Sequence, residues 1–198
     1  MNRKRKTLLG GLFVSLLLLA ADQLTKYLAE SHLMGSRGVE VIPGVFQLFY
    51  LQNRGAAFGM MENRQWFFAA VALVMMLAAG YVYARLPLEK HYSLLRAVCV
   101  LIVSGAAGNM IDRILHGYVI DFLYFSLIDF PVFNVADCYV CVGAALGVLA
   151  IFTLYREDDF GFLFPEKKNS RIVSDAPGKP AENAENVHDG KHAGRTGR

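Results

Sequence analysis

Charged residues are scarce in this sequence and unevenly spread along it. Only 19% of the 198 residues are Asp, Glu, Lys or Arg, whereas 55% are hydrophobic. In a soluble domain about a quarter of the residues are charged. Because the charges cluster, they leave long uncharged runs, a pattern that indicates a membrane protein.

The sequence also lacks the usual patterns of metal and nucleic-acid sites. Cys99, Cys138 and Cys141 all fall in apolar runs, where we expect buried packing. There is no second cysteine pair and no HExxH motif, and none of the five histidines has metal-ligand spacing. Basic residues cluster at helix ends rather than in a nucleic-acid patch. We therefore expect no metal, no cofactor and no nucleic-acid partner.

Four uncharged runs, at residues 7–21, 65–84, 97–111 and 138–155, are candidates for membrane-spanning helices. The first and third are shorter than the roughly 20 residues that a span needs. Each continues into a part-polar stretch, ADQLTKYLAE or NMIDRIL, which we interpret as the last turns of the helix. The first run imitates a secretory signal, but Leu19 stands where cleavage needs a small residue, so we expect it to be retained. The sequence therefore predicts an all-α membrane protein with four transmembrane helices.

The distribution of Lys and Arg predicts the orientation of these helices. Four basic residues, at positions 3–6, precede the first span, and Arg85, Lys90 and Arg96 follow the second. The connection after the third span has only Arg113, among several aspartates. Both termini are therefore predicted to be cytoplasmic, with two loops outside.

The loops and the tail differ in composition. In the first outer loop, residues 30–64, VEVIPGVFQLFYLQN predicts two or three short strands in a small extracytoplasmic β-rich domain. The second outer loop, 116–133, is shorter and aromatic. We assign residues 1–158 to the membrane domain and 159–198 to a polar, disordered cytoplasmic tail. Phe160, Phe162, Leu163 and Phe164 are expected to lie on the membrane surface.

Aspartates on three of the predicted helices are expected to lie in one layer near the outer surface. At 1.5 Å per residue, each lies about 24 to 28 Å from the basic anchor at the other end of its helix. The hydrocarbon core is about 30 Å thick. The three aspartates are Asp22, Asp112 and Asp137.

Amides and cations are predicted in the same layer. Asn109 and Asn134 each precede an aspartate by three residues and so share its helix face. Lys26 and Arg113 supply positive charge nearby. Ionisable groups at membrane depth usually mark a functional site.

Structural roles are open for some of these residues. Asp22 can hold the first span in place by pairing with Lys26, and Asp112 can form a structural ion pair with the adjacent Arg113. Asp129 precedes Phe-Pro in a loop, where a solvated turn residue is the simplest interpretation.

Asp121 and Asp137 are harder to explain as structural. Each is flanked by apolar residues on both sides, in VIDFLY and NVADCY, without an adjacent cation. Two carboxylates that lie close together can share one proton, so that one acts as a general base on water and the other polarises a carbonyl. That chemistry hydrolyses a peptide without a metal or a nucleophilic serine.

Four motifs together resemble lipoprotein signal peptidase, also called signal peptidase II, across residues 8 to about 156. They are ADQLTKYL (21–28), NRGAAFG (53–59), GAAGNMIDRILHGYVIDF (105–122) and FNVAD (133–137). The resemblance implies a bacterial inner-membrane aspartic peptidase with four spanning helices. Such an enzyme removes the signal peptide of a prolipoprotein just before its diacylglyceryl-modified cysteine. We expect it to act as a monomer in the bilayer.

The resemblance assigns the catalytic pair to Asp121 and Asp137, and Asp129 matches no motif residue. It places supporting residues around them: Asp22, Asn53, Asn109, Asp112, Arg113 and Asn134. The rival hypothesis is a small proton-coupled carrier that uses intramembrane aspartates as a relay. A carrier predicts polar residues through the full depth of the membrane, whereas runs such as VGAALGVLAIFTL contain almost none.

Overall fold

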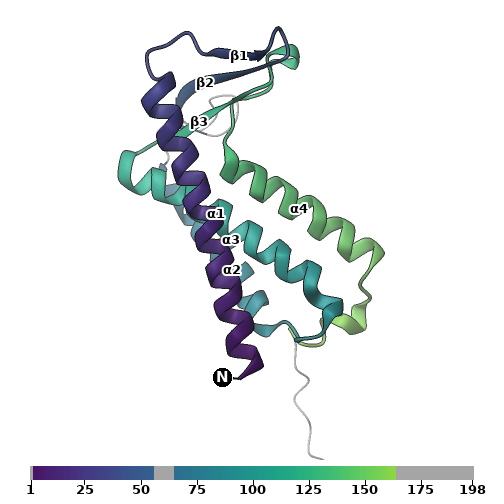
Figure 1. The fold of residues 1–198 in the computed structure, drawn as a ribbon. Coiled ribbons are helices and arrows are strands. Elements are labelled where there is room, and N and C mark those ends of the chain that lie inside the picture. The colour runs from purple at the N-terminus through teal and green to yellow at the C-terminus, as the bar shows by residue number, and fades with distance from the viewer. Residues whose placement is uncertain (1, 56–64, 164–198) are drawn as a thin grey trace, which may run out of the picture. The chain divides into compact units, whose positions relative to one another are not determined.

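The computed structural model describes residues 2–55 and 65–163. The described residues form four long helices, which are α1 (Arg3–Leu33), α2 (Gln65–Arg85), α3 (Ser93–His116) and α4 (Val135–Thr153) (Figure 1). All four are long and apolar enough to cross a membrane, so the four predicted spans are confirmed. As expected, α1 and α3 continue through the part-polar stretches that follow their apolar runs.

Helix α3 is the central helix and packs against α1, α2 and α4. Two of its glycines allow this close approach. A Cβ atom at Gly105 would collide with the Ala136 carbonyl oxygen of α4, and one at Gly108 would collide with the Asp22 carboxylate of α1. Small residues therefore bring the acidic side chains of α1 and the start of α4 against the same part of α3.

The strands form one antiparallel sheet in the order β1–β2–β3. Strands β1 (Val39–Ile42) and β2 (Phe46–Asn53) come from the first loop, as predicted. The third strand, β3 (Val119–Tyr124), comes from the second loop, where we had predicted no strand. Its first four residues are all buried, so its sequence lacks the alternation that identifies a half-exposed strand. In the β2–β3 register, Asn53 pairs with Val119 and Leu51 with Asp121.

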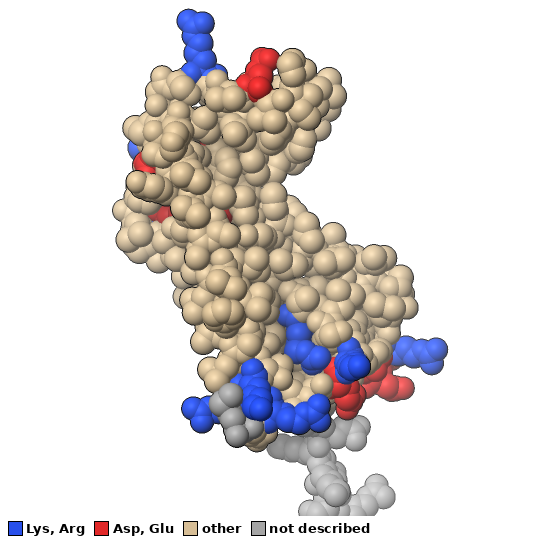
Figure 2. Space-filling model, in the orientation of Figure 1, with Lys and Arg blue, Asp and Glu red and all other residues tan. Residues whose placement is uncertain are grey.

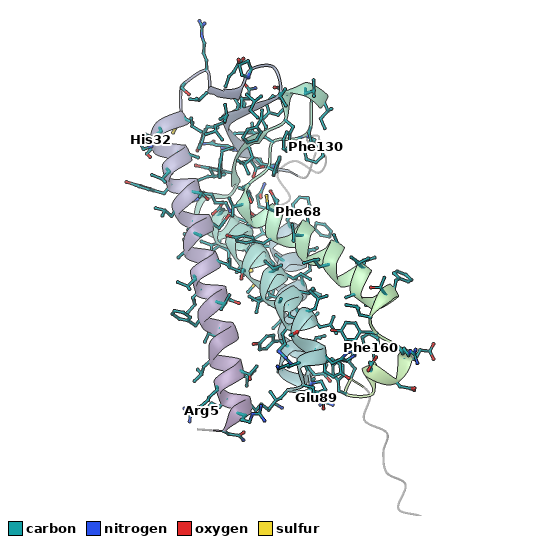
Figure 3. The ribbon with its side chains drawn as sticks, turned by 45° about the vertical axis from the view of Figure 1, so that its right-hand side comes forward. Arg5, His32, Phe68, Glu89, Phe130 and Phe160 are labelled. Carbon is teal, nitrogen blue, oxygen red and sulfur yellow. The ribbon has the colours of Figure 1, made fainter. Side chains whose placement is uncertain are left out.

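The two ends of the described unit differ in chemistry. Arg5, Glu89 and Phe160 lie at one end, which we call the basic end, whereas His32 and Phe130 lie at the other, with the sheet (Figure 3). Figure 2 shows most of the Lys and Arg surface near the basic end, and an almost uncharged band across the middle of the visible face. This distribution fits helices that cross an apolar layer.

Residues just after the predicted end of the membrane domain, at 158, pack at the basic end. Phe160 and Phe162 pack against a buried cluster at the basic end that includes Tyr92 and Tyr155. The Tyr92 hydroxyl donates to the Asp159 carbonyl oxygen at 3.0 Å. The packed unit therefore continues past residue 158, and these two phenylalanines are partly buried against protein. Phe164 and the rest of the predicted tail lie outside the described residues.

Candidate active site

The start of α4 holds Asp137 in place. Asn134 is the N-cap residue, and its Oδ1 accepts a hydrogen bond from the Asp137 backbone N–H at 2.9 Å. In return, Asp137 Oδ2 accepts one from the Asn134 backbone N–H at 3.1 Å. The spacing of three residues, noted in the sequence, is therefore a capping box. It fixes the Asp137 carboxylate at the N-terminus of a helix, where the helix dipole favours negative charge.

Asp121 reaches the same place from β3. Its carboxylate accepts hydrogen bonds from Asn53 Nδ2 at 2.8 Å and from Asn134 Nδ2 at 2.7 Å. The residue is only 2% exposed. Burial, together with the neighbouring Asp137 carboxylate, raises the pKa of Asp121 to about 7, although the amide hydrogen bonds oppose this shift.

Two asparagines connect the pair of aspartates. Asn134 contacts both, since its side chain donates to Asp121 while its backbone N–H donates to Asp137. Asn109 donates from Nδ2 to Asp137 Oδ1 at 2.7 Å. Its Oδ1 accepts a hydrogen bond from Asn134 Nδ2 at 3.0 Å. All four carboxylate oxygens of the pair therefore accept at least one hydrogen bond from an amide.

A buried ion network lies beside the pair. The Lys26 ammonium is 3.0 Å from Asp22 Oδ2 and 2.9 Å from Asp112 Oδ2, and all three side chains are at most 2% exposed. The expected Asp22–Lys26 pairing is confirmed. Asp112, however, pairs with Lys26 and not with its neighbour Arg113, because consecutive residues on a helix point in different directions.

Arg113 points toward a different partner. Its guanidinium lies over the Phe68 ring, 5.3 Å from the centroid, and its Nη1 donates to the Asn109 carbonyl oxygen at 3.3 Å. Figure 3 labels Phe68 between the sheet and the middle of the helices. Arg113 and Phe68 line a cavity of about 210 Å³ between α2, α3 and α4, and Asp137 lies in its wall. A cation and one of the two carboxylates thus face the same space.

Asp129 lies away from this site. It ends a short 3-10 helix (Ser126–Ile128) with φ of 49°, and it accepts a hydrogen bond from the Tyr124 hydroxyl at 2.6 Å. Asparagine and aspartate tolerate this left-handed conformation better than most residues. The interpretation of Asp129 as a turn residue is confirmed.

Sequence reasoning underestimated Lys26 and missed Gln23. Lys26 was expected to pair with Asp22, yet it also contacts the Asp112 carboxylate and Asn109 Oδ1. The Gln23 amide donates to Asp112 Oδ1 at 3.0 Å and to Asp22 Oδ2 at 3.2 Å. Both residues belong to the ADQLTKYL motif. Their polar side chains, close to Asp22 in the sequence and therefore at its predicted depth, could have identified them as part of the site.

The fold and the site together define a class of protein. Helices able to span a membrane surround a buried polar layer, and that layer holds two amide-bound carboxylates at the sheet end of the described unit. Such an arrangement suits acid–base catalysis.

Comparison with known proteins gives the family. The family model for signal peptidase (SPase) II matches residues 14–153. Lipoprotein signal peptidases of Streptococcus pyogenes serotypes M6 and M5 are 40% and 39% identical over 147 residues, which cover 74% of this chain and 93% of each relative. The chain belongs to the signal peptidase II family and is therefore a peptidase.

Solved structures agree with this assignment. A bacterial membrane enzyme determined by the in meso method at 2.3 Å resolution has a TM-score of 0.64 and 28% sequence identity, covering 75% of this chain and 92% of that one. A second, at 1.9 Å resolution, has a TM-score of 0.63.

Proposed function

We propose that this peptidase removes signal peptides from prolipoproteins, cutting just before the diacylglyceryl-modified cysteine. The observation that carries the proposal is the pair of amide-bound carboxylates, Asp121 and Asp137, joined by Asn134 in a member of the signal peptidase II family. The curated relatives are named as lipoprotein signal peptidases, which supports this class of substrate.

In the proposed reaction the pair holds one proton. The ionised carboxylate takes a proton from water, whose oxygen attacks the scissile carbonyl carbon, while the protonated carboxyl donates a hydrogen bond to the carbonyl oxygen. The tetrahedral intermediate then collapses, the C–N bond breaks, and the leaving nitrogen receives a proton from the pair. Fixed amide donors are suited to this chemistry because they need little reorganisation as charge moves.

The surrounding residues then have positioning roles. Asn53, Asn109 and Asn134 orient the carboxylates through the hydrogen bonds described above. Asp22 and Asp112 support the site from α1 and α3. Arg113, in the wall of the cavity between α2, α3 and α4, faces the space in which we place the substrate.

We further propose that the sheet end faces the outside of a bacterial inner membrane and that both termini are cytoplasmic. The basic residues of the opposite end support this orientation. The site then lies near the outer surface, where acyl chains stay in lipid and the sheet covers the substrate backbone. We expect the monomer to be sufficient for activity.

The carrier hypothesis has less support. Among the described residues, the buried polar side chains belong to the site layer, apart from Ser104. The Ser104 hydroxyl donates to the Val100 carbonyl oxygen of its own helix at 2.7 Å. A relay across the whole membrane needs polar groups that continue to the basic end.

The test uses the full chain, purified in detergent, with a diacylglyceryl-modified prolipoprotein and its unmodified counterpart. We expect the modified substrate to be shortened and the unmodified one to remain intact. EDTA should leave the rate unchanged, since only carboxylates and amides take part. Cleavage of neither substrate by folded protein would refute the proposed function, and loss of activity with EDTA, restored by zinc, would refute the carboxylate mechanism.

A further inference from the structure

The ammonium group of Lys26 has all its donors engaged inside the protein. It contacts Asp22 Oδ2 at 3.0 Å, Asp112 Oδ2 at 2.9 Å and Asn109 Oδ1 at 3.0 Å. An ammonium has three N–H donors, so none is left for a substrate. Lys26, which is 2% exposed, can therefore affect the reaction only through its neighbours.

One of those neighbours is Asn109, whose amide orientation depends on Lys26. Asn109 Oδ1 accepts hydrogen bonds from both Lys26 Nζ and Asn134 Nδ2, each at 3.0 Å. These two donors identify that atom as the oxygen, which leaves Nδ2 to donate to Asp137 at 2.7 Å. A cation on the amide oxygen also polarises the amide and strengthens the donor at its other end.

Lys26 also joins two supports of the active-site backbone. Asp22 Oδ1 accepts from the Ala136 N–H at 2.9 Å, and Asp112 Oδ2 accepts from the Ile120 N–H at 3.1 Å. Each of these backbone groups belongs to the residue just before one aspartate of the catalytic pair. One buried cation therefore connects α1 and α3 to the local backbone of both aspartates.

We infer that Lys26 is a positioning residue that acts through Asn109 and keeps Asp137, rather than Asp121, as the ionised base of the pair. This inference rests on the proposed function. Asp137 receives the Asn109 donor backed by Lys26 and lies at the N-terminus of α4, whereas the donors to Asp121 are side-chain amides from Asn53 and Asn134. The other charged groups that act on Asp137 are Asp121 and Arg113. Asp22 and Asp112 are paired with Lys26.

The test is the pH dependence of kcat/KM, measured on Lys26→Met and on Lys26→Arg. Without the cation, the base becomes easier to protonate. In Lys26→Met we therefore expect the acid limb, which is the fall of kcat/KM at low pH, to shift to higher pH by about one unit. Lys26→Arg keeps the charge and should keep the limb in place, even if its rate is lower. A Lys26→Met variant that is slow but has an unmoved acid limb would show a merely structural role and overturn the inference.

Lys26→Met leaves two buried carboxylates without a cation, which can prevent folding. A second pair of variants therefore tests the inference without this imbalance of charge. The double variant Lys26→Met/Asp112→Asn removes one charge of each sign, and its matched reference is Asp112→Asn alone. The acid limb of the double variant should lie about one pH unit above that of the reference. Coincident limbs would contradict the inference.

The route through Asn109 has its own test. When Asn109→Ala is already present, Lys26→Met should move the acid limb much less than it does in the wild type, because the two residues act in series. An undiminished shift would mean that Lys26 acts on Asp137 through space and not by positioning. If the wild type cleaves and both catalytic-pair variants are inactive, but none of these shifts appears, only this inference fails and the proposed function stands.

Discussion

Among individual residues, Asn134 connects the most parts of the site. It is fully buried, and it caps α4 while donating to both Asp121 and Asn109. The capping role needs only a side-chain oxygen, whereas the contacts to Asp121 and Asn109 need the amide nitrogen. The helix cap and the proposed chemistry therefore depend on different atoms of one side chain.

Replacing Asn134 with serine or alanine should separate these two contributions. Ser keeps an N-cap acceptor but has no amide donor, so we expect it to melt below the wild type and above the Ala variant, with a cleavage rate lower by about two powers of ten. Ala removes both functions and should also cost about 1 kcal/mol of helix stability. Thermal melting and cleavage kinetics in detergent measure the two effects. Equal melting temperatures for Ser and Ala would contradict the capping argument, and a fully active Ser variant would contradict the catalytic one.

The raised pKa of Asp121 predicts how activity and stability change with pH. In the proposed mechanism turnover needs the Asp121 proton, so the rate should fall on the alkaline side with a midpoint near the pKa of about 7. Stability should fall between pH 3.8 and about 7 and then level off, because over that range the folded protein retains a proton that the unfolded chain has lost. In Asp121→Asn the fall in melting temperature from pH 5 to pH 8 should be smaller. An equally steep fall would show that Asp121 does not titrate there.

At the scale of elements, the close approach of α3 to α1 places the acidic groups together. Gly108 of α3 faces the Asp22 carboxylate so closely that a Cβ atom would collide with it. A Cβ atom added to Gly10, near the other end of α1, would meet nothing within 4 Å. These two glycines therefore provide a matched pair for testing helix packing.

Gly108→Ala should destabilise the protein by about 1 to 3 kcal/mol and lower activity, because α1 must move away from α3. Gly10→Ala should be neutral or slightly stabilising, since alanine favours the helix. Thermal melting and cleavage rates of the two variants test this. Equal effects on stability would contradict the packing argument.

The sequence pattern predicted the structural features that are determined by residues close together in the chain. It missed the features that require contacts between distant residues. The four spans follow from apolar run length. The Asn134–Asp137 spacing was noted as a shared helix face, whereas the structure shows it to be a cap. Strand β3 exists because it pairs with β2, more than sixty residues earlier in the chain. Likewise, Asp112 pairs with Lys26 of α1 rather than with its sequence neighbour Arg113, which no spacing rule identifies.

At the scale of the whole chain, the site needs only part of the sequence. The family match ends at residue 153, and the relatives are covered almost fully by three quarters of this chain. The described residues beyond that point close the basic end, where Arg85 Nη2 donates to the Phe162 carbonyl oxygen at 3.0 Å. Residues 157–163 therefore contribute packing, and we expect the residues after them to be unnecessary for the chemistry we propose.

Two C-terminal deletions test the roles of residues 157–163 and of the residues after them separately. Deleting residues 170–198 should leave both cleavage and melting temperature unchanged. Deleting residues 157–198 removes Phe160 and Phe162 from the aromatic cluster and should lower the melting temperature by several degrees. If the shorter deletion abolishes activity, the C-terminal segment is part of the enzyme. If the longer deletion melts like the wild type, the cluster does not stabilise the fold.

The most direct test of the central claim is mass spectrometry of the products formed from a diacylglyceryl-modified prolipoprotein by the wild type and three Asp→Asn variants. The wild type should release a product that begins at the modified cysteine. Asp121→Asn and Asp137→Asn should lower the rate by at least about three powers of ten while staying folded. Asp129→Asn, the matched control in the turn, should cleave normally. Normal turnover by either variant of the pair, or an inactive Asp129 variant, would contradict the assignment of Asp121 and Asp137 as the catalytic pair.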